Sequence, residues 1–308
     1  MPGETKKDAP SAKKVCLHYI ASKLIVPYPP AAPDVDRTPY EMIAYWRNIW
    51  KYLVPTDTDR IHLRRLCLLF NDSLEPTPDN KKGRYTVYPH PNPNYTSLAS
   101  LLARCYALYN EDPTRAPTIL FIKQGDYEVL GNYLEINYPI KIFGAGRDKT
   151  IVRGGFRIEG TKEEGKKVEV SNMTIQGAKE VGLLGWKGLS FLCKDVTITQ
   201  CGYHGVYAYT TQGQLLNCTI TQCGRCGVCT SGTAKVEVQG DQTKVDDNCT
   251  SEKNNDYGLK TITSTSNIHL LFPLTKETVS TNNGGGGNYG SSSFDGGTDT
   301  IQTVDTFE

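Results

Sequence analysis

A stretch of sequence that occurs twice constrains this chain more than any other feature. Residues 196–207 read VTITQCGYHGVY, and residues 218–229 read CTITQCGRCGVC, an offset of 22 residues. A fainter third copy begins at Met173, 23 residues before Val196. A repeat of this period indicates stacked supersecondary units, none of which can bury its apolar face alone.

The contents of the repeat favour strands over helices. Each copy holds a β-branched triplet such as Val196-Thr197-Ile198, followed by glycine-rich corners, with no room for a helix. About 22 residues accommodate three short strands with their turns, which is one rung of a parallel β-helix whose rungs lie about 4.8 Å apart. We expect a right-handed coil, because parallel crossover connections are almost always right-handed.

The residues before the repeats resemble the start of a pectate-lyase-like β-helix. A helix is expected after Thr96-Ser97, where it would close the open first rung. Its apolar residues share one face, namely Leu98, Leu101, Leu102, Cys105 and Leu108. A strand at Thr118–Ile122 and a second one leading to Gly144-Ala-Gly146 follow. The resemblance covers residues 96–275 and implies an all-β, single-stranded, right-handed parallel β-helix.

Composition divides the chain into segments. We expect a flexible lead at 1–36, a small helical segment at 37–76, a Pro-rich linker at 77–95, the β-helix at 96–275, and a Gly/Ser/Thr-rich tail at 276–308. The tail is expected to be flexible or to wrap the last rung.

The helical segment resembles an F-box. Residues 49–57 read IWKYLVPTD, and a leucine- and arginine-rich helix, RIHLRRLC, follows at 60–67. The resemblance implies binding to a Skp-type adaptor of a cullin ubiquitin ligase, chiefly through Leu53, Pro55, Ile61, Leu63 and Leu66. The family's usual leucine-proline start is replaced by Arg37-Thr-Pro39-Tyr40. The alternative is a helical hairpin that only packs against the rest of the chain.

Charge and hydropathy exclude several partner classes. The formal net charge of +1 over 308 residues gives no general attraction to nucleic acid or to an acidic membrane. No apolar run is long enough to span a bilayer, and the Lys-rich start has no signal-peptide core. We therefore expect a soluble, cytoplasmic or nuclear protein whose ten cysteines are reduced.

Catalytic chemistry finds little support in the repeats. Pectate-lyase-like folds often carry polysaccharide lyases or hydrolases, and the hydrolases need two carboxylates on neighbouring rungs. Asp195 has no acidic partner at the repeat spacing, and Asp246 and Asp247 lie in a polar excursion at 241–256. No catalytic residue is therefore predicted, and a carbohydrate-active enzyme stays an alternative.

Two ligand pairs raise the hypothesis of a zinc site. Cys201-x-x-His204 and Cys223-x-x-Cys226 would stack on neighbouring rungs, so that four zinc-type ligands come together. The alternative is that a 22-residue repeat produces this spacing by itself and that the cysteines occupy core or turn positions. No other cofactor is expected.

Aromatic residues mark a recognition surface. Tyr203, Tyr207, Tyr209 and Arg225 fall in the two clear rungs, and Tyr207 and Tyr209 alternate with Ala208, so that both tyrosines point outward. Such residues suit protein binding, although they can equally pack against a loop or the tail. We expect a non-catalytic, protein-recognition β-helix, which the F-box resemblance would make a substrate receptor of a ubiquitin ligase. A structural subunit of a larger assembly is the other alternative.

Overall fold

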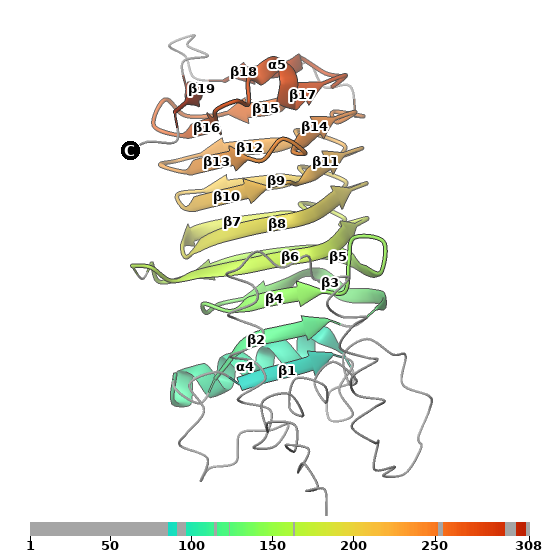
Figure 1. Cartoon of the computed structure of the whole chain (residues 1–308), viewed down its shortest axis with the longest axis vertical. Coiled ribbons are helices and arrows are strands. Elements are labelled where there is room, and N and C mark those ends of the chain that lie inside the picture. Colours follow the sequence, from blue (N-terminus) through green and yellow to red (C-terminus); the bar gives the residue numbers. More distant parts are fainter. Residues whose placement is uncertain are drawn as a thin grey trace, which may run out of the picture.

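A computed structural model of the chain describes residues 86–90, 97–113, 116–122, 124–162, 164–251, 255–292 and 300–305. Over these residues the chain is a right-handed parallel β-helix, as the repeat and the resemblance predict. The strands form rungs stacked along the long axis (Figure 1). The F-box-like segment at 37–76 and its five proposed adaptor contacts lie outside the described residues.

Each rung contributes to three parallel faces. The first face consists of β1 (Thr86–His90), β2 (Pro117–Ile122), β4 (Lys141–Gly144), the first halves of β6 (Lys167–Gln176) and β8 (Ser190–Thr199), β10 (Gln212–Leu216), β13 (Lys235–Gln239), β16 (Asn267–Leu271) and β19 (Ile301–Val304).

Along the chain, each strand of the first face is followed by a strand of the second face and then by one of the third face. The second consists of the first parts of β3 (Gly125–Ile136) and β5 (Thr150–Gly160), the second halves of β6 and β8, β11 (Thr219–Thr221), β14 (Lys244–Asp246) and β17 (Ser280–Thr281). The third consists of the second parts of β3 and β5, β7 (Leu183–Gly188), β9 (Val206–Tyr209), β12 (Val228–Ser231), β15 (Tyr257–Thr261) and β18 (Gly287–Ser291).

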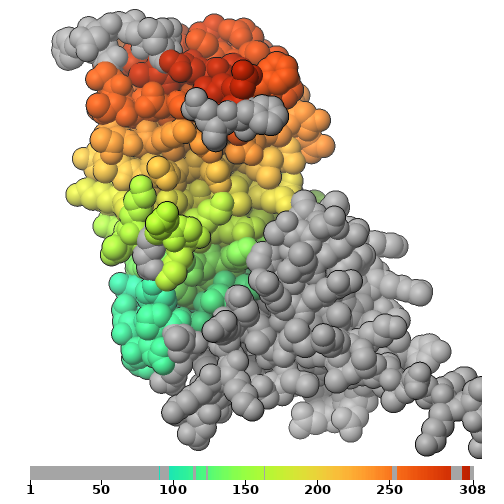
Figure 2. All heavy atoms as spheres, turned by 60° about the vertical axis from the view of Figure 1, so that its left-hand side comes forward, coloured from blue at the N-terminus to red at the C-terminus, as the bar shows by residue number. Residues whose placement is uncertain are grey.

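The register of the strands reproduces the sequence repeat. Ile198 pairs with Ile220 and Val206 pairs with Val228, which are the 22-residue offsets of the two clear copies. Met173 pairs with Val196, so the fainter third copy is also one rung away. The coloured bands of Figure 2 show the same order of stacking on the surface of the molecule.

Inward positions build the core. Ile198, Ile220 and Val245 are fully buried on successive rungs, whereas the neighbouring threonines of the TIT triplets are only half-buried. Phe191 fills the interior beside Gly213, where an added Cβ would lie 2.2 Å from its ring. Gly213 is therefore the residue that leaves space for this aromatic ring.

A helix closes the N-terminal end of the core. α4 (Leu98–Glu111) begins at Ser97, whose hydroxyl accepts a hydrogen bond from the Ser100 amide, and the Ser100 hydroxyl completes the capping box. All five apolar residues of the predicted face are buried. The helix lies at the N-terminal end of the coil (Figure 1), where it packs against β3, which confirms the predicted capping helix.

The coil continues beyond residue 275. A short helix, α5 (Lys276–Val279), is followed by β17, β18 and β19, which pair with β14, β15 and β16. The described part of the Gly/Ser/Thr-rich segment thus extends the rungs and covers the edge of the preceding rung. Across the described residues, no helix combines the length and apolar character needed to cross a membrane.

Candidate functional site

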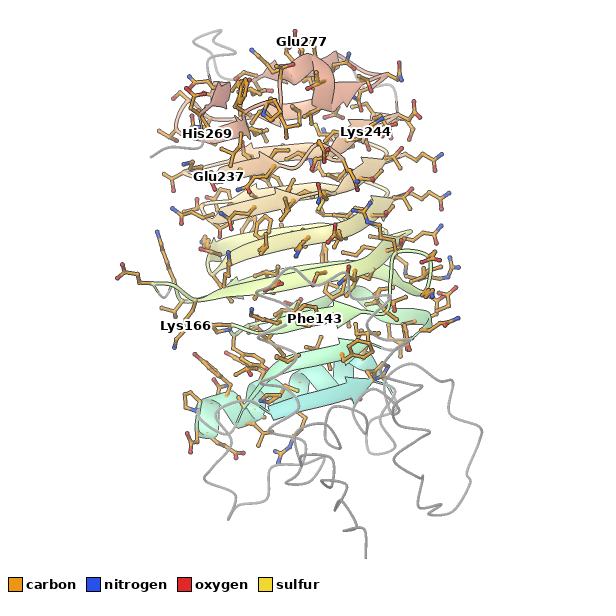
Figure 3. The ribbon with its side chains drawn as sticks, viewed as in Figure 1. Phe143, Lys166, Glu237, Lys244, His269 and Glu277 are labelled. Carbon is orange, nitrogen blue, oxygen red and sulfur yellow. The ribbon has the colours of Figure 1, made fainter. Side chains whose placement is uncertain are left out.

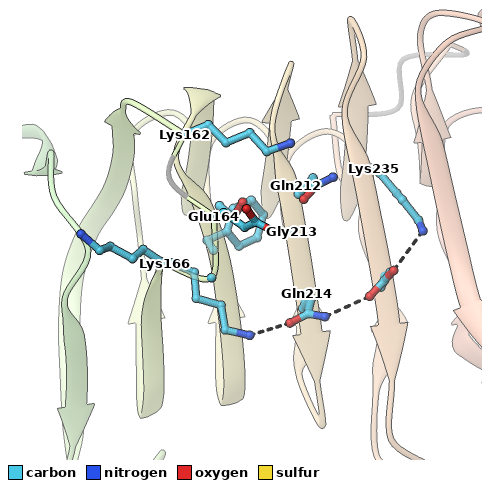
Figure 4. A pocket seen from close by; sticks show the side chains of 12 residues that line it. Lys162, Glu164, Lys166, Gln212, Gly213, Gln214 and Lys235 are labelled. Carbon is cyan, nitrogen blue, oxygen red and sulfur yellow. Dashed lines mark hydrogen bonds and ion pairs between the residues drawn. The ribbon is translucent and has the colours of Figure 1, made fainter.

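A groove of about 740 Å³ lies on the first face. Residues 162 and 164–166 form one wall, and β6, β8, β10 and β13 form the floor (Figure 4). Its charged lining comprises four lysines and two glutamates, namely Lys162, Lys166, Lys167, Lys235, Glu164 and Glu237. Because lysines outnumber glutamates, the groove favours anionic groups.

A chain of polar contacts crosses the floor of this groove. Lys167 donates to the Gln214 side chain over 2.8 Å, and the Gln214 amide donates to Glu237 over 3.0 Å. Lys235 forms an ion pair with the same carboxylate at 3.0 Å. Burial alone would raise the pKa of Glu237, but the contacts from Gln214 and Lys235 hold it below its usual value. His269 follows Glu237 on the next rung, as Figure 3 shows.

The predicted recognition residues lie on and beside the third face. Tyr203 is 47% exposed, and the Arg225 guanidinium carbon lies 5.4 Å from the centroid of its ring. Tyr207 and Tyr209 are half-buried and alternate with the buried Ala208, so both side chains lie on the outer side of β9.

Sequence reasoning missed one member of this surface. Trp186 stacks on Tyr209 with ring centroids 4.5 Å apart and an interplanar angle of 27°. The two residues pair directly between β7 and β9, 23 positions apart. The repeat spacing, extended one rung upstream, is the signal that would have found the tryptophan. We call Trp186, Tyr203, Tyr207, Tyr209 and Arg225 the aromatic surface.

The four proposed zinc ligands separate into two pairs. Cys201 and Cys223 belong to the hydrophobic core, and their thiols contact each other across neighbouring rungs. His204 and Cys226 lie outside that core, and Cys229 joins them. Cys229 was not among the predicted ligands, although Cys226-Gly-Val-Cys229 has the same spacing as Cys223-x-x-Cys226. The eight cysteines in the described part of the chain are free thiols.

His204, Cys226 and Cys229 gather closely. One ligand atom from each lies within 4.8 Å of the others, and all three residues are buried. The Cys229 thiol, followed by the neighbouring His204, lowers the pKa of Cys226 to about 5 against the opposing effect of burial. Cys226 is therefore the most acidic thiol of this group.

A buried carboxylate adjoins the group. Asp256 is 0% exposed and pairs with Arg225 Nε at 2.8 Å and with Lys260 Nζ at 3.6 Å. Burial would raise the pKa of Asp256, but Arg225 and Lys260 outweigh it and hold the value below the usual range. Its Oδ1 lies 3.5 Å from Cys226 Sγ. The predicted excursion at 241–256 is shorter than expected, because β14 (Lys244–Asp246) continues the rung and only 247–256 leaves it. The contact of Asp256 with Cys226 depends on the fold of this 247–256 excursion, for which the sequence carries no periodic signal.

Other carboxylates on the outer faces are held by arginines. Glu135 and Glu159 flank Arg157 at 3.8 and 2.6 Å, and Asp126 approaches Arg153 at 2.6 Å. Such pairs neutralise the carboxylates instead of leaving one as an acid and the other as a base.

Comparison with known proteins concerns the fold. A family model described as "Right handed beta helix region" matches residues 147–272. The chain is similar to ORF18 of Geobacillus virus E2, at 16% identity and a TM-score of 0.36, over 50% of this chain and 33% of that chain. It is also similar to the catalytic domain of a GH87 alpha-1,3-glucanase in complex with tetrasaccharides, at 12% identity and a TM-score of 0.40, over 75% of this chain and 46% of that chain. The chain thus spans less than half of either structure, and no curated protein matches it.

The groove yields a pH prediction. The charge of Glu237 contributes stability above the unfolded glutamate pKa of about 4.3, and this contribution is lost as the pH falls through the lowered folded pKa. At neutral pH, Glu237→Gln should therefore unfold at a lower urea concentration than wild type. The loss in the free energy of unfolding should be about 1 kcal/mol or less, because solvent screens the pair. The difference should shrink and then vanish as the pH falls through this lowered pKa. Glu164→Gln, at the exposed rim, is the matched control, and a Glu237→Gln deficit that stays constant with pH contradicts the assignment.

Proposed function

We propose that this chain is a non-catalytic recognition protein whose aromatic surface binds a protein partner. The observation that carries the proposal is the occurrence of Trp186, Tyr203, Tyr209 and Arg225 on neighbouring rungs, on and beside the third face. Tryptophan, tyrosine and arginine are the residue types that dominate binding energy at protein interfaces.

The scaffold favours tight binding because it holds these side chains in place before a partner arrives. Tyr209 is fixed by Trp186, and Arg225 is fixed by Asp256 beneath it. Side chains that are already ordered lose little conformational entropy when they bind. Tyr203 is the member most open to solvent, so it is the natural first contact.

Truncation of the aromatic surface tests this proposal. Partners recovered from native cells with the full chain should bind Tyr203→Ala and Trp186→Ala at least ~30-fold more weakly than wild type, since removing a central contact costs about 2 kcal/mol. Binding is measured by calorimetry with the purified partner. Phe272→Ala, which removes an aromatic side chain that is 65% exposed outside this surface, is the control. If all three variants bind as tightly as wild type, the aromatic surface is not the binding site.

The groove favours a second candidate, the binding or processing of an acidic polysaccharide. Four lysines and the side-chain amides of Gln212 and Gln214 line a groove on a parallel sheet. Such a lining can bind the carboxylates of a chain of acidic sugars.

Polyuronide binding tests the second candidate. Lys162→Ala and Lys167→Ala should each weaken binding roughly fivefold, and added salt should weaken it further. Lys244→Ala, on the second face, should leave it unchanged. The assay also follows unsaturated products and new reducing ends, which separate processing from binding. Absence of polyuronide binding to the wild-type protein removes this candidate.

The partner class suggested by residues 37–76 is a Skp-type adaptor, which would make the protein a substrate receptor. This part of the proposal rests on the sequence resemblance. A purified adaptor should be retained by the full-length chain and lost when Leu53 and Pro55 are both changed to alanine, because these residues supply apolar contacts in the resemblance. Tyr203→Ala should retain the adaptor. Failure of the wild-type chain to retain it excludes the receptor role.

A further inference from the structure

The cysteine and histidine residues that face outward between β9, β12 and β15 form a cluster that the proposed function does not use. Cys226 and Cys229 are fully buried, yet neither is part of the continuous apolar cluster that fills the coil. Cys229 pairs with Tyr207 on one side and with Lys260 on the other, both in outer columns of the third face. Core packing therefore does not explain why two thiols are buried on the outer side of the coil.

We propose that His204, Cys226, Cys229 and Asp256 form a structural zinc site. Thiolate and imidazole ligands suit Zn²⁺, whereas Ca²⁺ and Mg²⁺ prefer oxygen ligands alone. The histidine and both cysteines already lie within 4.8 Å of one another. The carboxylate of Asp256, which lies beside Cys226 but outside this 4.8 Å group, would supply the fourth ligand.

The separation between Cys226 and Asp256 fits a tetrahedral site. Bond lengths of about 2.3 Å to sulfur and about 2.0 Å to oxygen place a sulfur and an oxygen about 3.5 Å apart on one tetrahedral ion. Cys226 Sγ and Asp256 Oδ1 are separated by 3.5 Å. The backbone amide of Tyr257 also donates to Cys226 Sγ over 3.5 Å, which is the type of contact that supports a metal-bound thiolate.

The charges around the cluster fit as well. Two thiolates and a carboxylate around a divalent ion leave one net negative charge. Arg225 and Lys260, both paired with Asp256, compensate for it at 2.8 and 3.6 Å. His204 is 9% exposed, and its Nδ1 has no hydrogen-bond partner among the described residues. A buried ring with an unsatisfied nitrogen is costly, so a metal bond to His204 would offset part of that cost.

Burial of all four residues indicates a closed site, which is the arrangement of structural zinc. The ligands come from the β9 rung, the β12 rung and the end of the 247–256 excursion. The ion would therefore fasten the excursion to two rungs. This inference does not depend on the proposed recognition function, since metal content is measured without any partner.

Metal analysis of the untagged full chain, purified in reductant with zinc supplied, tests the site. We expect one zinc ion per chain after dialysis. Cys229→Ser should lower the zinc content at least tenfold, and His204→Gln should do the same. Cys201→Ser and Cys223→Ser are the matched controls, because these core cysteines belong to the same repeats, and both should keep the ion. Circular dichroism confirms that each variant is folded.

Measurements on the wild-type chain keep the test independent of the variants. X-ray absorption should show two sulfur ligands at about 2.3 Å and nitrogen or oxygen ligands at about 2.0–2.1 Å. A chelator should lower the melting temperature of wild type and leave that of Cys229→Ser unchanged. Zinc far below one ion per chain would overturn the proposal. So would retention of zinc by Cys229→Ser with loss in the Cys201 and Cys223 variants, or a disulfide between Cys226 and Cys229 seen by intact mass in the reduced preparation.

Discussion

The fold depends on parallel pairing between successive rungs, held in register by a column of inward β-branched residues. Ile198, Ile220 and Val245 pair in sequence along the second face and are fully buried. A slip of one residue would turn each of them outward and bring threonines into the core. Each inner rung is paired with the rungs on both sides, so the coil is rigid along its length. The positions of the outward side chains are therefore fixed by the same pairing.

That constraint determines how chemistry can appear on the surface. Residues one repeat apart lie in columns, so each outer position is repeated along the axis. Stacking of Trp186 on Tyr209 and the contact of Gln214 with Glu237 both join residues in directly paired positions. The corners obey the same rule, because Gln200 and Gln222 both take left-handed backbone conformations and their side chains contact each other. A parallel β-helix therefore builds surface features as rows.

Much of the fold followed from this periodicity, and the site followed less well. The repeat predicted the stacking of Val206 on Val228, and the apolar face predicted the buried side of α4. Spacing alone could not tell which cysteines turn inward. Cys201 and Cys223 belong to the continuous apolar cluster inside the coil, whereas Cys226 and Cys229 do not, although all four fall in the two repeat copies. The direction of a side chain at a corner depends on local backbone angles, which the spacing of residues does not report.

Insertions between rungs place residues where the regular repeat cannot. Val206 and Val228 are 22 positions apart, but Val228 pairs with Leu259, 31 positions away. Val245 already lies 25 positions after its partner Ile220, and the rest of the extra residues fall at 247–256. The backbone of this segment at Cys249 and Ser251 bonds to the corner at 224–225 of the preceding rung. Pairing then resumes in register, so the coil tolerates the insertion while Asp256 is brought over Cys226. Residues 162 and 164–166 likewise form a wall of the groove above the repeated strands. The groove and the proposed zinc site thus arise where an irregular segment folds back on a regular face, because such a segment brings together residues that do not lie in one column.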